Sequence, residues 1–175
     1  MKLKKGETVV VVAVILIVLV MLPGMIRENI GLIKMIRFNK PVKVGERGYL
    51  FEETTLGGER VSMEGKKTLL VFFKTHCPSC EKGMSMLREY SERLKKQSVG
   101  VVCISNENEA ALKGYPPLEK ITWDLISDPD MRIIKKYRVK YVICFVYVDQ
   151  DGIIRYYQQP DEKLEAVFQS VLDLI

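Results

Sequence analysis

The sequence predicts an α/β domain in which helices flank a central mixed β-sheet, preceded by an N-terminal transmembrane helix. Three features predict this: a long apolar run near the N-terminus, apolar strands on both sides of a helical stretch within residues 69–105, and a hairpin pattern around residues 149–152. The chain has 175 residues, which suffices for one domain of ordinary size with a terminal attachment.

Composition and charge exclude several classes of protein. Apolar residues make up 47% and charged residues 28%, so a disordered or low-complexity chain is excluded. Of 27 Lys and Arg, nine lie in residues 1–47 with three acidic residues, which leaves 18 basic against 19 acidic residues in the remainder. A nearly neutral body argues against a nucleic-acid partner, and the basic N-terminal quarter indicates an anionic lipid surface.

The apolar run is the first element. No polar residue interrupts Val9–Leu22, and the stretch 8–26 approaches the ~20 residues that a helix needs to cross a bilayer. Lys2, Lys4 and Lys5 precede it, as in a secretory signal or a signal anchor. Because no small-x-small cleavage motif follows the run, we expect residues 1–26 to form an uncleaved membrane anchor.

Residues 27–42 are a basic juxtamembrane linker, which either lies on the lipid headgroups or is simply solvated. Basic residues stand on both sides of the span, so the positive-inside rule is nearly balanced. A first helix usually enters with its short basic end in the cytoplasm, and a large following domain can be translocated regardless of charge. We therefore expect a single-pass protein of the plasma membrane with the domain 43–175 on the extracytoplasmic side.

The centre of the domain reads as strand, helix, strand. Residues 69–74 (LLVFFK) and 99–105 (VGVVCIS) are short apolar runs, as in buried strands. Between them, residues 79–96 carry apolar side chains at the spacing of one helical face, at Met84, Leu87, Tyr90 and Leu94. Because such an order requires a crossover connection, the two strands are expected to be parallel.

Turn residues separate the remaining elements. We expect a hairpin of strands 49–54 and 60–62 around Gly57-Gly58, a helix at 106–113, a strand at 123–126, a helix from Asp128-Pro129 to about 137, a hairpin of strands 142–148 and 153–157, and a last helix capped by Asp161. The antiparallel pair at 142–157 is what makes the predicted sheet mixed.

Cys77 and Cys80 lie at the junction of the strand 69–74 and the helix that follows. Unpaired N–H groups and the macrodipole at a helix N-terminus favour a thiolate there. Pro78 suits the first helical position, and Cys80 is close enough to Cys77 to form a disulfide. Thiol-disulfide exchange needs an exposed attacking thiolate and a second thiol that resolves the mixed disulfide. We therefore expect Cys77 to attack and Cys80 to resolve.

Four pieces of the chain, spread over about residues 43–170, resemble one family. They are VGERGYLFEETTLGGERVSM, then THCPSC, then WDLISDPDMRIIKKYRV, and finally VYVDQDGII before a terminal helix. In this order, behind an anchor, the chain resembles the membrane-anchored thioredoxin-like thiol-disulfide oxidoreductases of the TlpA and ResA type, with MauD proteins as relatives.

This resemblance implies a thioredoxin fold, electron exchange with protein thiols and disulfides outside the plasma membrane, and no bound organic cofactor. It also implies two partners. One is a membrane electron-transfer protein, and the other is an exported cysteine-containing client such as an immature cytochrome c or a maturing enzyme. The direction, reductase or oxidase, stays open because residue spacing does not reveal a reduction potential.

The chain departs from the family pattern near the cysteines. The usual cis-proline aligns with Ile143, and because a cis bond before another residue costs ~2.5 to 4 kcal/mol, we expect a trans bond there and an altered substrate-binding edge. His76 replaces the usual tryptophan, and it either stabilises the Cys77 thiolate when protonated or is a surface substitution. The acids that relatives use near the second cysteine align with Val71 and Gly83, so the proton acceptor for Cys80 is unidentified.

The four cysteines have other conceivable roles. Cys103 is expected to be a core residue, and Cys144 either packs in the core or approaches the active pair. Cys77 and Cys80 could instead form an inert disulfide, belong to a redox-inactive interaction module, or bind zinc or copper, although one adjacent histidine leaves too few ligands for structural zinc. Peroxidase chemistry is disfavoured because Lys74 stands where its threonine is expected.

Overall fold

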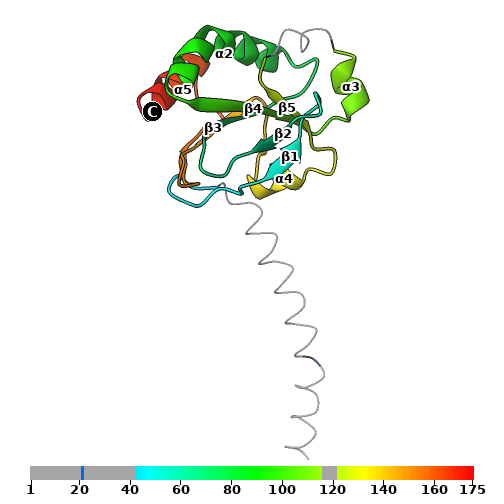
Figure 1. Ribbon diagram of the computed structural model, residues 1–175, viewed down its shortest axis with the longest axis horizontal. Coiled ribbons are helices and arrows are strands. Elements are labelled where there is room, and N and C mark those ends of the chain that lie inside the picture. Colours follow the sequence, from blue (N-terminus) through cyan, green and yellow to red (C-terminus); the bar gives the residue numbers. More distant parts are fainter. Residues whose placement is uncertain (1–20, 22–41, 116–121) are drawn as a thin grey trace, which may run out of the picture. The chain divides into compact units, whose positions relative to one another are not determined.

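The computed structural model describes residues 42–115 and 122–175, together with Met21 (Figure 1). Its contacts divide the chain into two units, Met1–Lys40 and Pro41–Ile175, and the elements below belong to the second. The predicted anchor and linker fall almost wholly outside the described residues. Within the described part of the chain, no helix combines the length and the apolar character that a membrane crossing needs.

A five-stranded mixed sheet forms the centre, as the sequence predicts, with strand order β5-β4-β3-β6-β7. The strands are β3 (Lys67–Phe72), β4 (Val99–Ser105), β5 (Asp124–Ser127), β6 (Cys144–Val148) and β7 (Ile154–Tyr157). Strand β4 runs parallel to β3 and β5, whereas β6 is antiparallel to both β3 and β7. Helix α2 (Pro78–Lys96) connects β3 to β4, which confirms the expected strand-helix-strand crossover.

The other elements cover the sheet and its edges. They are β1 (Glu52–Thr54) and β2 (Arg60–Ser62), which form an antiparallel hairpin, and the helices α3 (Glu109–Lys113), α4 (Arg132–Lys136) and α5 (Leu164–Leu172). Helices α2 and α5 lie on one face of the sheet and α4 lies on the other (Figure 1). This three-layer arrangement buries both faces of the sheet.

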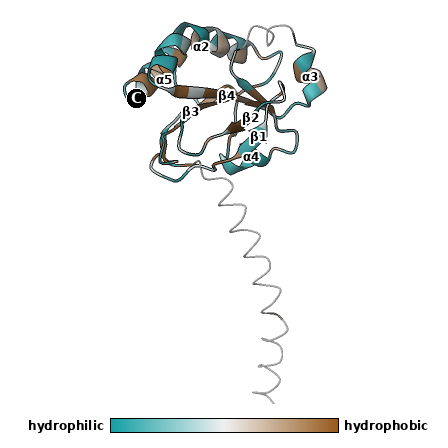
Figure 2. Cartoon of the chain, in the orientation of Figure 1, coloured by the Kyte–Doolittle hydropathy of each residue, from teal (hydrophilic) through white to brown (hydrophobic). Residues whose placement is uncertain are grey.

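Two hydrophobic cores result, one on each face. Because successive side chains of a strand point to opposite faces, Leu69 and Val71 of β3 enter the first core, while Leu70 and Phe72 enter the second. Leu87, Leu94, Val167 and Phe168 of α2 and α5 complete the first core, and Phe51, Val61 and Ile133 contribute to the second. Figure 2 shows the strands largely in hydrophobic colours beneath helices that carry hydrophilic residues.

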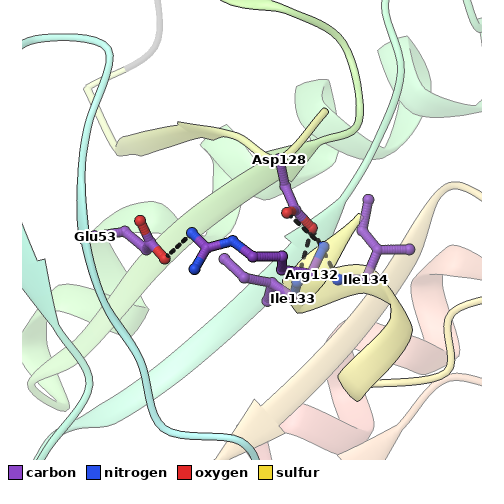
Figure 3. Close-up of polar contacts among 5 residues, drawn as sticks. All are labelled: Glu53, Asp128, Arg132, Ile133 and Ile134. Carbon is purple, nitrogen blue, oxygen red and sulfur yellow. Dashed lines mark hydrogen bonds and ion pairs between the residues drawn. The ribbon is translucent and has the colours of Figure 1, made fainter. Parts of the chain in front are cut away.

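Helix α4 begins three residues later than predicted, at Arg132 rather than next to Asp128-Pro129. Its N-cap is Met131, which adopts a left-handed conformation with φ 54° and makes no side-chain cap. Asp128 still supplies the cap from a distance, because its carboxylate accepts hydrogen bonds from the backbone N–H groups of Arg132 (2.7 Å), Ile133 (2.9 Å) and Ile134 (3.0 Å) (Figure 3). Asp128 therefore does satisfy the first N–H groups of the helix, as predicted, but it is not the N-cap residue, and the predicted helix start was wrong.

Figure 3 also shows how α4 is tied to the first hairpin. The Arg132 guanidinium reaches Glu53 of β1 at 2.6 Å. Asp128 is only 4% exposed, so its side chain is buried with its hydrogen-bonding capacity used by the helix N-terminus.

The start of α5 differs from the prediction as well. The helix begins at Leu164, and its N-cap, Lys163, makes no side-chain capping bond. Asp161 does not cap it. A turn precedes the helix instead, in which Glu162 N–H donates to the Gln159 carbonyl and the Glu162 carboxylate accepts from Gln159 N–H at 3.1 Å. The carboxylate that accepts a backbone N–H before α5 is thus that of Glu162 and not that of Asp161.

Candidate active site

The loop between β3 and α2 places Cys77 at the start of the helix. Cys77 is the N-cap residue, with extended backbone (φ −112°, ψ 109°), and Pro78 follows in the first turn. The Cys77 sulfur takes the place of the usual capping oxygen, because it accepts the Cys80 backbone N–H at 3.3 Å. It also lies 3.2 Å from the Ser79 hydroxyl oxygen. The expected thiolate position is therefore built from local helix geometry.

The two sulfurs of the pair have opposite electrostatic environments. Partial burial is the largest influence on the Cys77 pKa and would raise it, but hydrogen bonds from Cys80 and Ser79 together lower that pKa below the usual thiol value. Burial first, and then the hydrogen bond and charge of Cys77, raise the Cys80 pKa to about 12. Cys77 is half-buried and Cys80 is 2% exposed. Both are free thiols. Exposure and pKa together make Cys77 the accessible, more acidic thiol and Cys80 the buried thiol that keeps its proton.

His76 points its ring at an aromatic neighbour. It is exposed and has a positive φ of 53°, and its ring meets that of Tyr115 edge-on with centroids 4.8 Å apart. The Tyr115 hydroxyl donates a hydrogen bond to Glu81, which follows Cys80 in α2. Tyr115 thus connects the residue before Cys77 with the residue after Cys80.

The peptide bond between Val142 and Ile143 is cis, so the expected trans bond is wrong. The expectation rested on the intrinsic preference of an isolated peptide bond for the trans form, which tertiary structure can override. Ile143 is 5% exposed in the first core, where its side chain lies against Gly83 of α2. A Cβ at Gly83 would lie 2.6 Å from Ile143 Cδ1, so a larger side chain at this position would require the Ile143 side chain to move.

Cys103 and Cys144 both pack in the core, as expected for buried free cysteines. Cys144 belongs to the second core, on the face of the sheet opposite Cys80, so the structure does not bring it to the active pair. Burial raises the Cys144 pKa to about 12, against the lowering effect of hydrogen bonds with Tyr141 and Tyr157. Cys103 shares the first core with Cys80, and burial raises its pKa as well.

One site residue was missed from the sequence. Glu107 follows β4, and its carboxylate accepts hydrogen bonds from the backbone N–H and the hydroxyl of Thr75, two residues before Cys77. The available signal was that the ends of the parallel strands β3 and β4 meet at one edge, which brings these two loops together. Residue type alone did not single out Glu107 among the acids nearby.

The described residues hold no obvious metal site. No group of three or more His, Cys, Asp or Glu side chains lies close enough together in residues 42–115 and 122–175 to hold one ion.

Val71, which aligns with a buried acid of thioredoxins, is completely buried among apolar neighbours.

Comparison with known proteins decides the family. The AhpC/TSA family matches residues 44–157, more than half of the chain. This chain belongs to that family. Peroxiredoxin Bcp of Escherichia coli (strain K12) is 29% identical over 134 residues, which cover 73% of this chain and 86% of that protein. Thiol-disulfide oxidoreductase ResA of Halalkalibacterium halodurans is 24% identical over 116 residues, covering 64% of this chain and 66% of that protein.

The fold agrees with this assignment. The crystal structure of peroxidoxin BcpB from Mycobacterium tuberculosis is similar with a TM-score of 0.66 and 16% identity, over 75% of this chain and 95% of that one. The AhpC/TSA chain is therefore a thioredoxin-like α/β protein with a mixed sheet, and a thiol-based oxidoreductase whose distant homologues include both ResA-type oxidoreductases and Bcp peroxiredoxins.

Proposed function

We propose that this protein is a thiol-disulfide oxidoreductase in which Cys77 attacks and Cys80 resolves. The observation that supports this most directly is the asymmetry of the pair. Cys77 is accessible and accepts hydrogen bonds that favour its thiolate, whereas Cys80 is buried, with a pKa raised to about 12. Thiol-disulfide exchange needs two thiols of different ionisation, because the attacking sulfur must be a thiolate and the resolving sulfur reacts only after the mixed disulfide has formed.

In the reductive direction, the Cys77 thiolate attacks one sulfur of a client disulfide and displaces the other as a thiolate. A mixed disulfide joins Cys77 to the client. Cys80 then loses its proton and attacks the Cys77 sulfur, which releases the second client thiolate and leaves a Cys77–Cys80 disulfide. Two electrons pass to the client, and the reverse sequence oxidises a client dithiol.

The partners proposed for this reaction rest on the resemblance to the TlpA and ResA type, and the membrane location rests on the apolar N-terminal run. The apolar run Val9–Leu22 would tether the domain to the plasma membrane, with clients among exported proteins and a membrane electron-transfer protein renewing the pair. The potential of the Cys77–Cys80 couple, measured against glutathione buffers, would assign the direction, since a strongly reducing couple passes electrons to clients and an oxidising one accepts them.

A peroxiredoxin function is the second candidate, favoured by the 29% identity with peroxiredoxin Bcp. In that reaction the Cys77 thiolate attacks a peroxide oxygen, releases water or alcohol, and becomes a sulfenic acid. Cys80 then condenses with the sulfenic acid to form the disulfide, and this step releases one water. We rank it second because Lys74 occupies the position of the threonine that peroxidase chemistry is expected to use.

One experiment separates the two candidates. The reduced full-length protein, purified in detergent, is offered either insulin, whose disulfide reduction produces turbidity, or hydrogen peroxide, whose consumption is followed directly. Exchange is expected with insulin in the wild type, lost in Cys77→Ser, and retained in the control Cys103→Ala. Cys80→Ser should accumulate a mixed disulfide with the client. Peroxide consumption without insulin reduction would favour the peroxiredoxin, and equal insulin rates in wild type and Cys77→Ser would contradict the proposed function.

A further inference from the structure

The Glu107 carboxylate forms two hydrogen bonds with the loop that carries Cys77. One carboxylate oxygen accepts the Thr75 backbone N–H at 2.8 Å, and the other accepts the Thr75 hydroxyl at 2.6 Å. Both bonds involve an ionised acceptor, which makes them stronger than hydrogen bonds between neutral groups. Thr75 and Glu107 are 32 residues apart in sequence, so this is a tertiary contact and not part of a local turn.

Glu107 is itself held in place. The Ser105 hydroxyl donates to its carboxylate at 2.9 Å, and its own N–H donates to the Ser105 hydroxyl oxygen at 3.3 Å. The Ser127 hydroxyl donates to the Glu107 carbonyl at 2.7 Å. Because Ser105 ends β4 and Ser127 ends β5, the carboxylate is anchored to the rigid edge of the sheet.

The loop that Glu107 binds, residues 73–77, is short and sharply turned. Its first residue, Phe73, donates its N–H to the Ile104 carbonyl at 3.1 Å, which continues the pairing of β3 with β4. Between Thr75 and Cys77, His76 adopts a positive φ of 53°, a conformation uncommon for residues other than glycine. Fixing Thr75 thus fixes one side of a turn whose other side is the extended N-cap residue Cys77.

The ionised form of Glu107 is favoured by this arrangement. Partial burial would raise its pKa, but the hydrogen bonds from Thr75 and Ser105 and the nearby charge of Lys74 together lower it. Glu107 is therefore ionised at neutral pH. In this form both of its carboxylate oxygens can accept, one from the Thr75 N–H and the other from the Thr75 hydroxyl.

We propose that Glu107 is a positioning residue for Cys77: by holding Thr75, its carboxylate keeps the loop in the conformation in which the Cys77 sulfur caps α2. The proposal rests on the proposed role of Cys77 as the attacking thiol. Glu107 acts through Thr75 and the backbone, not on the substrate.

The test is the pH profile of Cys77 alkylation by iodoacetamide, read residue by residue by mass spectrometry in the full-length protein. Glu107→Gln keeps the shape, but its amide NH₂ cannot accept a hydrogen bond from Thr75. Loosening the cap should move the midpoint of the Cys77 profile upward by about 0.5 to 1 in pH, and slow labelling below the midpoint about 3- to 10-fold. A nearby negative charge acting directly would predict the opposite, because its removal would lower the Cys77 pKa.

Two further comparisons make the result specific. Glu109→Gln removes the same charge from an exposed residue of α3 whose ion pair is with Lys113, and it should leave the midpoint within about 0.2 of the wild type. Thr75→Val, which removes the hydroxyl donor but keeps the N–H, should shift the profile in the direction of Glu107→Gln. Thr75→Ser, which restores the hydroxyl, should return it to the wild-type position.

The outcomes are distinguishable. If Thr75→Val folds, as judged by circular dichroism, and its profile matches the wild type or moves downward, the positioning role is wrong, whether or not Glu107→Gln folds. An upward shift that Thr75→Ser reverses supports it. Alkylation does not require disulfide exchange, so a wild-type Cys77 that labels no faster than a peptide thiol would contradict the proposed function instead.

Discussion

Ile143 packs directly against Gly83: a Cβ built on Gly83 would stand 2.6 Å from Cδ1 and 3.3 Å from Cγ2 of Ile143. Gly83 lies in α2 three residues after Cys80, and Ile143 directly precedes β6. Two departures from the resembled family, a glycine in place of an acid and an isoleucine in place of a proline, are therefore one complementary contact beside the buried cysteine. The isoleucine fills the space that the glycine leaves open.

We predict that Gly83→Ala destabilises the protein only while Ile143 keeps its full side chain. Alanine improves helix propensity by about 1 kcal/mol, but overpacking a filled core costs about 1–3 kcal/mol, so the net change should be unfavourable. Ile143→Val removes Cδ1, and in that background Gly83→Ala should be neutral or stabilising. Urea unfolding of the four proteins measures the coupling, and an equal effect of Gly83→Ala in both backgrounds would contradict it.

The side chain at position 80 should tune the reactivity of Cys77. A side-chain hydrogen bond from Cys80 is the foremost of the influences that lower the Cys77 pKa, after burial has raised it. Cys80→Ala removes that donor and should raise the Cys77 pKa, so that labelling at neutral pH slows. Cys80→Ser keeps a donor hydroxyl and should remain close to the wild type. The alkylation rates of both variants between about pH 5 and 9 decide this, and identical profiles would show that the backbone N–H alone sustains the thiolate.

Local patterns were enough to predict the mixed sheet and the strand-helix junction with its cysteines. Short apolar runs, helical spacing and the position of Pro78 after Cys77 are all local patterns, so they are visible in the sequence. The contact of Thr75 with Glu107 and the packing of Ile143 against Gly83 join segments far apart in the chain. The late start of α4 has a related cause, because the Asp128 carboxylate can serve N–H groups four to six residues ahead.

Asp128→Ala should cost stability without altering the active pair. The substitution leaves the N–H groups of Arg132, Ile133 and Ile134 without their acceptor. Asp128 itself is 4% exposed, so the lost acceptor is a buried one. Losing such a cap is expected to cost about 1–3 kcal/mol of the free energy of unfolding. Asp130→Ala, an exposed acid two residues away, is the matched control. Urea unfolding should separate the two variants while both retain the wild-type Cys77 alkylation profile; equal stabilities would show that α4 does not depend on this carboxylate.

The stability contributed by Glu107 should depend on pH in a defined direction. Its folded-state pKa is lowered, chiefly because the hydrogen bonds from Thr75 outweigh the effect of partial burial, so the unfolded chain takes up a proton more readily. The contribution is therefore fully present above the ordinary glutamate pKa of about 4.3, and it is lost as the pH falls through the lower folded value. Glutamine does not titrate, so the difference in unfolding free energy between wild type and Glu107→Gln should be largest near neutral pH and shrink below about pH 4. Urea unfolding of both proteins across this range measures it, with Glu109→Gln as the control. A difference that stays constant down to about pH 3 would mean that the ionised carboxylate does not hold Thr75.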